Sequence, residues 1–283
     1  MGVRTVVRDD LRNARRSWVV TGVVGVLAGL VALIFLSEAS IYDDPYRTVF
    51  DVSFFLFLVG PLVLAPLTYL AVAGDRASGR LRYVLGLPNS RAAYLAGTLA
   101  SRLAIAAAAV LVAVAVGFAV AAATFTSPPA VERFVAFAAV SVLYAASVVG
   151  VYVGVSAVTA SRSRAMVGVL GAYFLLVPFW FGFLPVVSLT NVLGALTDLV
   201  GVTLSAQTRD LIRSLSPATA YLVSTEVVYH GVLGGPYESI NENFVAQPDY
   251  LHREVWFAVL VMAVWGVGSV LAGYAAFVRS ELG

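Results

Sequence analysis

Six uncharged apolar segments restrict what this chain can fold into. Each is close to the roughly 20 residues that an α-helix needs to cross a lipid bilayer, and none contains Asp, Glu, Arg or His. Hydrophobic residues make up 60% of the chain and charged residues 12%, about half the charged share of a typical soluble domain. The sequence therefore predicts an all-α integral membrane protein with six transmembrane helices, at residues 18–36, 54–73, 103–124, 134–160, 166–190 and 255–278.

The distribution of arginine orients these helices. Of the 18 Arg residues, 13 fall in four short segments, which are 1–17, 74–102, 161–165 and 279–283. The other segments between the spans hold the remaining five Arg and 12 of the 16 acidic residues. Basic residues near the ends of spans stay on the cytoplasmic side. We therefore expect both termini in the cytoplasm, residues 74–102 as a cytoplasmic segment and residues 191–254 as a long extracytoplasmic segment.

Residues 1–17 have the pattern of a helix that lies in the membrane interface. One helical stripe is apolar, and beside it lies a basic stripe made of Arg4, Arg8, Arg12 and Arg15. In such a helix the apolar stripe contacts acyl chains while the cations meet anionic headgroups. A plain basic anchor for the first span would have a similar sequence, so both interpretations stay open.

The cytoplasmic segment 74–102 mixes apolar and basic residues. Helical spacing predicts a short amphipathic helix whose apolar face is formed by Ala77, Leu81, Val84 and Leu85. That face needs a surface to cover it, which is either the membrane or a partner protein. A solvated basic loop is the simpler alternative.

Local signals also predict where this short helix ends and the next begins. Gly86 and Pro88 would stop the first helix, and Asn89 or Ser90 could cap the second. The second helix is expected to run from Arg91 through the third span without a break, over about 50 Å. Part of it would then project into the cytoplasm.

Similar signals occur elsewhere in the chain. Ser216 and Pro217 have the pattern of an N-cap followed by a first-turn proline, so a helix is expected to begin there and to end near residues 231–235, where three glycines lie. Prolines within the second and fifth spans are expected to bend them, and these are Pro61, Pro66, Pro178 and Pro185.

Several chemistries lack the residues that they need. The chain has no Lys, which a Walker A loop uses to hold phosphate, so we expect no ATP hydrolysis by this chain alone. It has no Cys, and its two His residues lie in segment 191–254 outside any HExxH motif, so no metal site is predicted. No ionisable side chain lies at membrane depth to bind a coupling proton, which disfavours a secondary carrier.

Residues 74–102, GDRASGRLRYVLGLPNSRAAYLAGTLASR, resemble the element between the second and third spans of ABC-2 type permeases, the membrane subunits of ATP-driven exporters that include the NosY-like branch. In that family an acidic residue, a Gly, a Leu-rich helix and a P-x-S-R element follow in this order. The matching residues are Asp75, Gly79, Leu81, Leu85, Pro88, Ser90 and Arg91. Asp75 replaces the more usual Glu, and Arg102 stands where Lys is common. Leu215-Ser216-Pro217 is similar to an element after the fifth span of NosY-like members.

The resemblance implies a multi-pass permease subunit of the plasma membrane. It would work with a second permease subunit, identical or different, and with an ABC ATPase subunit on the cytoplasmic face. ATP and Mg would bind the ATPase, so this chain would carry no cofactor and would not be an enzyme, and no nucleic-acid partner is expected. Coupling to the ATPase would involve Asp75, Gly79, Leu81, Val84, Leu85, Pro88, Ser90 and Arg91.

Two other classes of function stay open. A membrane scaffold or maturation factor without transport activity is compatible with uncharged spans. A secondary carrier is less favoured for the reason given above. An ATPase gene beside this one would separate the permease from both.

Overall fold

The computed structural model of the protein describes residues 2–86, 90–184, 186–201, 203–229 and 254–279, and these contain helices and no β-strand. Within these described residues, five helices are long and apolar enough to cross a membrane, or six if the bent pair Tyr46–Leu58 and Gly60–Ala77 counts as one span. The predicted all-α membrane fold is therefore confirmed. The span helices are α2 (Trp18–Glu38), α3 (Tyr46–Leu58) with α4 (Gly60–Thr68), α7 (Arg91–Thr124), α8 (Val131–Val158), α9 (Arg162–Phe174) with the π-helix η1 (Leu175–Phe179), and α14 (Val255–Arg279).

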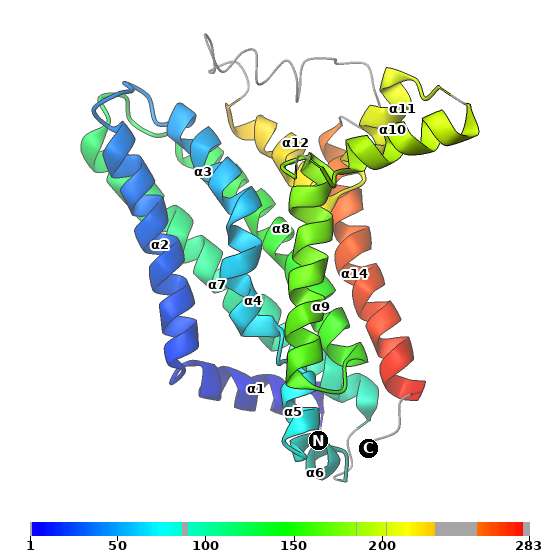
Figure 1. The fold of residues 1–283 in the computed structure, drawn as a ribbon. Helices are drawn as coiled ribbons and strands as arrows, with labels where there is room; N and C mark the ends of the chain where they lie inside the picture. Colours follow the sequence, from blue (N-terminus) through cyan, green and yellow to red (C-terminus); the bar gives the residue numbers. More distant parts are fainter. Residues whose placement is uncertain (1, 87–89, 185, 202, 230–253, 280–283) are drawn as a thin grey trace.

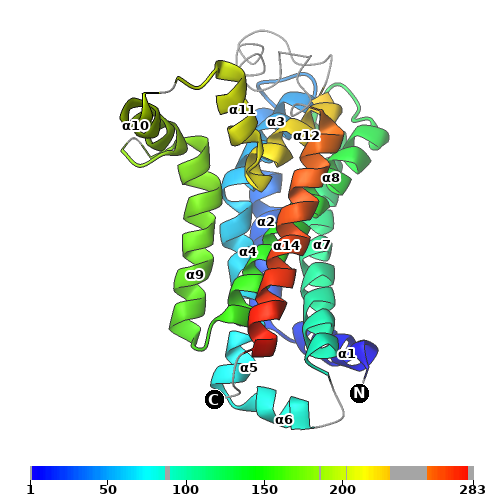
Figure 2. The same ribbon diagram turned by 90° about the vertical axis from the view of Figure 1, so that its right-hand side faces the viewer.

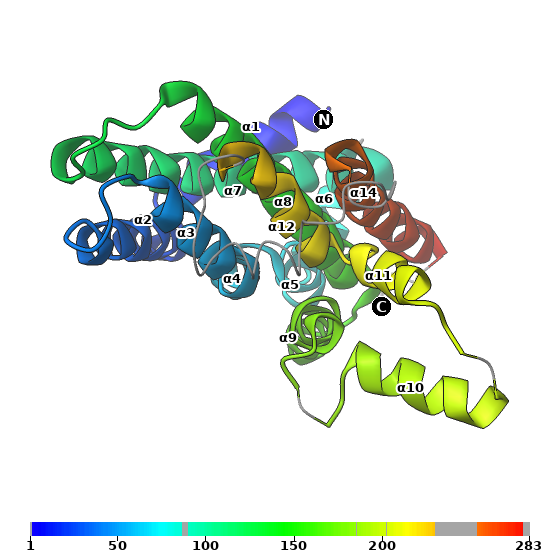
Figure 3. The same ribbon diagram turned by 90° about the horizontal axis from the view of Figure 1, so that it is seen from above.

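The spans run side by side, and shorter helices gather at their two ends (Figure 1). At one end lie α1 (Val3–Ala14), α5 (Ala73–Ala77) and α6 (Arg80–Gly86). Helix α1 runs from the lower end of α2 toward α5 and α6. At the other end lie α10 (Leu189–Val200), α11 (Ala206–Ser214) and α12 (Pro217–Tyr229). Seen along the bundle, α10 projects away from the spans (Figure 3).

Helix α8 occupies the centre of the bundle and contacts α4, α7, α12 and α14. Its closest partner is α14, because glycines on both helices allow the two backbones to touch. A methyl group on Gly273 would lie 2.7 Å from the Cα atom of Gly154, and one on Gly150 would overlap the carbonyl oxygen of Gly266. Small residues at such crossings are the usual route to tight packing between membrane helices.

The second span is bent by 44° where α3 meets the helical stretch Gly60–Ala77, which begins with α4. Pro61 has no N–H, so the carbonyl of Phe57, four residues earlier, loses its helical partner. The Tyr144 hydroxyl of α8 donates a hydrogen bond to that carbonyl at 3.0 Å. A side chain on a neighbouring helix thus satisfies the carbonyl that the proline leaves free, as a membrane interior requires.

The fifth span is shorter than the predicted segment 166–190. Helices α9 and η1 together cover residues 162–179, and Thr190 belongs to α10. Pro178 lies within η1, where the hydrogen bonding changes from the α to the π pattern, consistent with the predicted disturbance at this proline. Pro185, which we also expected to bend this span, lies outside the described residues.

The start of α12 is confirmed as predicted. Ser216 accepts a hydrogen bond from the Ala218 N–H at 3.2 Å and donates one to the Leu176 carbonyl of η1 at 2.7 Å. Pro217 occupies the first helical position, where a missing N–H does no harm. The glycines that we expected to end this helix lie outside the described residues.

Candidate functional site

Residues 74–102 form α5, α6 and the first turns of α7, at the same end of the bundle as α1 (Figure 2). The predicted short amphipathic helix forms as α6, with Leu81, Val84 and Leu85 on its apolar face. Including Ala77 in that face is wrong, because Ala77 ends α5 and the two short helices meet at Gly79. Gly79 has φ +75°, in the left-handed region that glycine reaches without the steric cost of a Cβ atom. The chain therefore turns between α5 and α6.

The apolar face of α6 packs on its own chain. Leu81 is only 1% exposed, so the expectation that this side chain is free to contact a partner is wrong. Val84 and Leu85 are partly buried against the same core. Instead α6 exposes Arg82 and Tyr83, and the Tyr83 side chain is 74% exposed. Pro88 lies outside the described residues.

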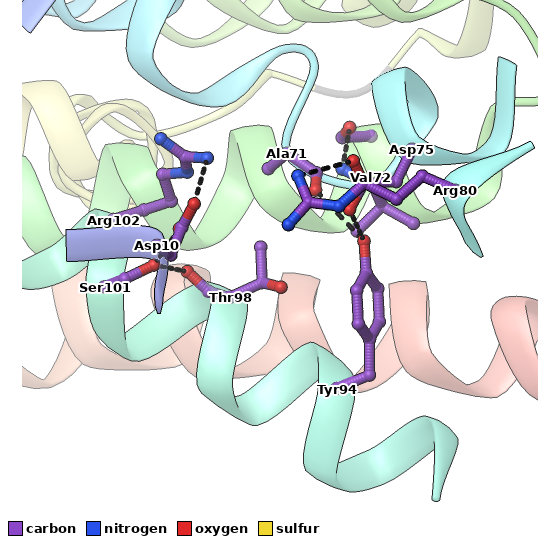
Figure 4. Close-up of polar contacts among 10 residues, drawn as sticks. Asp10, Ala71, Val72, Asp75, Arg80, Tyr94, Thr98, Ser101 and Arg102 are labelled. Carbon is purple, nitrogen blue, oxygen red and sulfur yellow. Dashed lines mark hydrogen bonds and ion pairs between the residues drawn. The ribbon is translucent and has the colours of Figure 1, made fainter. Parts of the chain in front are cut away.

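Asp75 faces inward from α5 and joins three helices (Figure 4). The Tyr94 hydroxyl of α7 donates a hydrogen bond to Asp75 Oδ2 at 2.8 Å, and Arg80 of α6 lies 3.6 Å from Asp75 Oδ1. Tyr94 is 2% exposed. Hydrogen bonds to a carboxylate are stronger than those between neutral groups. The Asp75–Tyr94 hydrogen bond and the Asp75–Arg80 ion pair therefore hold α5 and α6 against the Arg91 end of α7.

The start of α7 is tied to the end of α14. Ser90 caps α7 by accepting a hydrogen bond from the Ala93 N–H at 3.0 Å, as predicted, while Asn89 lies outside the described residues. Arg91 donates to the carbonyls of Phe277 and Val278 at 2.8 and 2.7 Å. A cation at a helix C-terminus also interacts favourably with the helix dipole. Arg91 is thus engaged with its own chain.

Helix α1 forms as predicted, and its arginines Arg4, Arg8, Arg12 and Arg15 are exposed, the last just beyond the helix end. Its contact with α7 uses residues that the sequence pattern did not single out. Asp10 accepts a hydrogen bond from Ser101 and forms an ion pair with Arg102 at 3.2 Å. Val6 packs so closely that a methyl group on Gly97 would lie 2.6 Å from its Cβ atom.

The sequence matches the family model described as ABC-2 family transporter protein over residues 4–282. The chain belongs to this family. It is accordingly a permease of an ABC transporter, a membrane component of the transport system, and the family implies an ABC ATPase as partner. No curated protein matches the sequence.

In this ABC-2 family permease, a cavity of about 100 Å³ lies between α1 and the short helices α5 and α6. Both ion pairs lie on its wall, which includes Asp10, Asp75, Arg80, Tyr94 and Arg102. The described residues contain no group of acidic or His side chains that could hold a metal ion. Ion pairs and a hydrogen bond around this cavity therefore connect α5 and α6 to α7, and α7 to α1.

The sequence indicated the segment but not two of the side chains that hold it, Tyr94 and Asp10, nor the exposed Tyr83. Tyr94 and Asp10 had no local signal, because their partners are distant in the sequence. Tyr83 could have been found, since it lies on the face of α6 opposite Leu81. An exposed Tyr beside an Arg is a typical signal of an interface.

Proposed function

We propose that this chain is the permease subunit of an exporter of the NosY-like branch in the plasma membrane. Two permease subunits would work as a pair, and an ABC ATPase would bind the cytoplasmic face of each. ATP and Mg would bind the ATPase chains. Their closure would push on α5 and α6 and change which side of the membrane has access to a central path.

Helix α6 provides the observation that carries this proposal. It exposes Arg82 and Tyr83 at the end of the bundle where α1 lies, while Leu81 holds its opposite side in the core. Tyr and Arg are enriched among the residues that dominate binding energy at protein interfaces. Arg80 of α6 pairs with Asp75 of α5, and Asp75 accepts a hydrogen bond from Tyr94 of α7. A force on the exposed face of α6 would therefore reach a membrane span.

The uncharged spans favour an apolar or amphiphilic substrate, which includes a lipid-linked one. No Asp, Glu, Arg or His lies in the six predicted spans. A charged substrate would need compensating charges at membrane depth, where desolvation is costly.

Affinity purification from native membranes tests the proposal. The tagged permease should retrieve an ABC ATPase chain, identified by mass spectrometry. The double variant Arg82→Ala plus Tyr83→Ala should bind that ATPase roughly 10- to 100-fold more weakly, because burying a large side chain contributes about 1.5–3 kcal/mol. Changing Leu81 instead would disturb the core of the permease itself.

The control variant is Arg162→Ala plus Arg164→Ala, which removes two exposed arginines from the other cytoplasmic segment and should retain the ATPase. Retention by the α6 double variant at the wild-type level would contradict the proposed contact. If the unmodified chain retrieves no ATPase, the scaffold interpretation is favoured. ATP hydrolysis by the purified chain alone would also contradict the proposal.

A further inference from the structure

Residues 69–72 connect α4 to α5, and a side chain from another helix enters the hydrogen-bond ladder there. In a continuous helix the N–H groups of Val72 and Ala73 would bond to carbonyls four residues earlier. Both instead donate to Ser156 Oγ of α8, each at 3.1 Å. The Ser156 hydroxyl in turn donates to the Tyr69 carbonyl at 2.8 Å. Insertion of a side chain into this ladder is a recognised cause of helix kinks.

Burial makes this insertion important. Val72, Ala73 and Ser156 are all 0% exposed, so water cannot replace the hydroxyl. A buried amide that loses its partner costs more than the net value of an ordinary hydrogen bond. Ser156 therefore satisfies three backbone groups that the interruption of the helix would otherwise leave without partners.

The same link is held from two further positions. The Tyr94 hydroxyl lies 3.4 Å from the Ala71 carbonyl, and Arg76 donates to the Thr159 carbonyl at the end of α8 at 3.3 Å. Figure 4 shows Tyr94 directed at both Ala71 and Asp75. The link between α4 and α5 is thus held by hydrogen bonds from side chains of α7 and α8 to its backbone.

We propose that residues 69–72 form a hinge between α4 and the coupling helices α5 and α6, and that Ser156 holds this hinge in one of two states. In the first state, observed here, the hydroxyl occupies the link. In the second state Ser156 withdraws, and the N–H groups of Val72 and Ala73 bond to the carbonyls of Thr68 and Tyr69, which makes α4 and α5 continuous. Both states satisfy the backbone, so α5 and α6 can move relative to α8 without leaving a buried amide unpaired. The proposed function is needed only to name ATPase closure as the force that moves the hinge.

The absence of native Cys allows a direct test in the purified full chain in lipid nanodiscs. Spin labels are placed on Tyr83→Cys of α6 and Ala96→Cys of α7, two exposed positions. Adding Ser156→Ala should shift their distance distribution by more than its wild-type width. The amides of Val72 and Ala73 should remain protected from hydrogen exchange, because they bond within the continuous helix.

Ser147→Ala is the matched control. Ser147 lies on the same helix and is 2% exposed, but its hydroxyl has no hydrogen-bond partner among the described residues. Its removal should leave the distance distribution unchanged. If Ser156→Ala does not fold, the near-isosteric Ser156→Cys, whose thiol is a weaker donor and acceptor, should shift the distance in the same direction by less. The buried thiol will not take up the label.

Two results would overturn the hinge. One is a distance distribution for the Ser156 variant that equals that of the control. The other is exchange of the Val72 and Ala73 amides about tenfold faster or more, which means a frayed link and not a re-formed helix. Neither measurement requires the ATPase, so the hinge can fail while the permease assignment stands, and the reverse also holds.

Discussion

Replacing Gly273 by Ala tests the close crossing of α8 and α14. The added methyl group would lie 2.7 Å from both the Cα atom and the carbonyl oxygen of Gly154, about 0.7 Å inside an ordinary contact of 3.4 Å. These are backbone atoms, so no side-chain rotation can relieve the overlap. The two helices must therefore move apart along their most extensive contact.

Gly268 supplies the reference for the size of this effect. It lies on the same helix, and a methyl group there would meet nothing within 4 Å. Both Gly→Ala changes gain the same helix propensity of about 1 kcal/mol, so this gain cancels in the comparison. Overpacking costs typically about 1–3 kcal/mol. At about 2–4 °C per kcal/mol, Gly273→Ala should unfold roughly 2–12 °C below Gly268→Ala.

The assay is thermal unfolding of both variants in the same nanodisc, followed by the loss of monodisperse protein in size-exclusion chromatography. Equal midpoints for the two variants would refute the argument, because they would mean that the helices separate at no cost. A lower midpoint for Gly268→Ala would refute it as well.

Three other predictions concern topology, pH and the tie between α7 and α14. An impermeant thiol reagent should label Ser90→Cys in inverted vesicles but not in intact cells, and Ser205→Cys in intact cells but not in inverted vesicles. Labelling of Ser90→Cys from outside would overturn the six-span topology. Burial raises the pKa of Tyr229 from about 10 to about 12, so its contribution to stability is complete below pH 10 and lost as the pH rises toward 12. Tyr229→Phe should therefore lose stability less steeply across this window in thermal unfolding. Arg91→Ala should lower the midpoint by a few degrees, because two partly exposed hydrogen bonds to the last turn of α14 are worth about 1 kcal/mol.

The features that the sequence predicted correctly depend on neighbouring residues. The 34-residue α7 and its Ser90 cap follow from an unbroken apolar run and a local capping signal. The start of α12 at Ser216 and Pro217 follows in the same way. Each of these elements is decided within one or two helical turns, so a single sequence is enough to predict it.

The features that were missed depend on contacts between distant segments. Periodicity found the apolar face of α6 but could not tell whether the cover is a partner or, as for Leu81, the chain's own core. The bond between Asp75 and Tyr94 and the insertion of Ser156 depend on how α5, α7 and α8 pack. A serine within an apolar helix has no pattern that marks it as the partner of another backbone.

The length of α7 has a mechanical consequence. About 18 Å of this helix, residues 91–102, precedes the predicted span, and about 33 Å, residues 103–124, lies within it, at 1.5 Å per residue. A stiff rod that turns about the point where it enters the membrane acts as a lever with arms of these lengths. A small sideways displacement at the Arg91 end would then become a nearly twofold larger displacement in the opposite direction at the Thr124 end. Helix α2 packs along α7, and α1 forms an ion pair with it. A displacement at Asp75 would therefore move α1, α2 and α7 together.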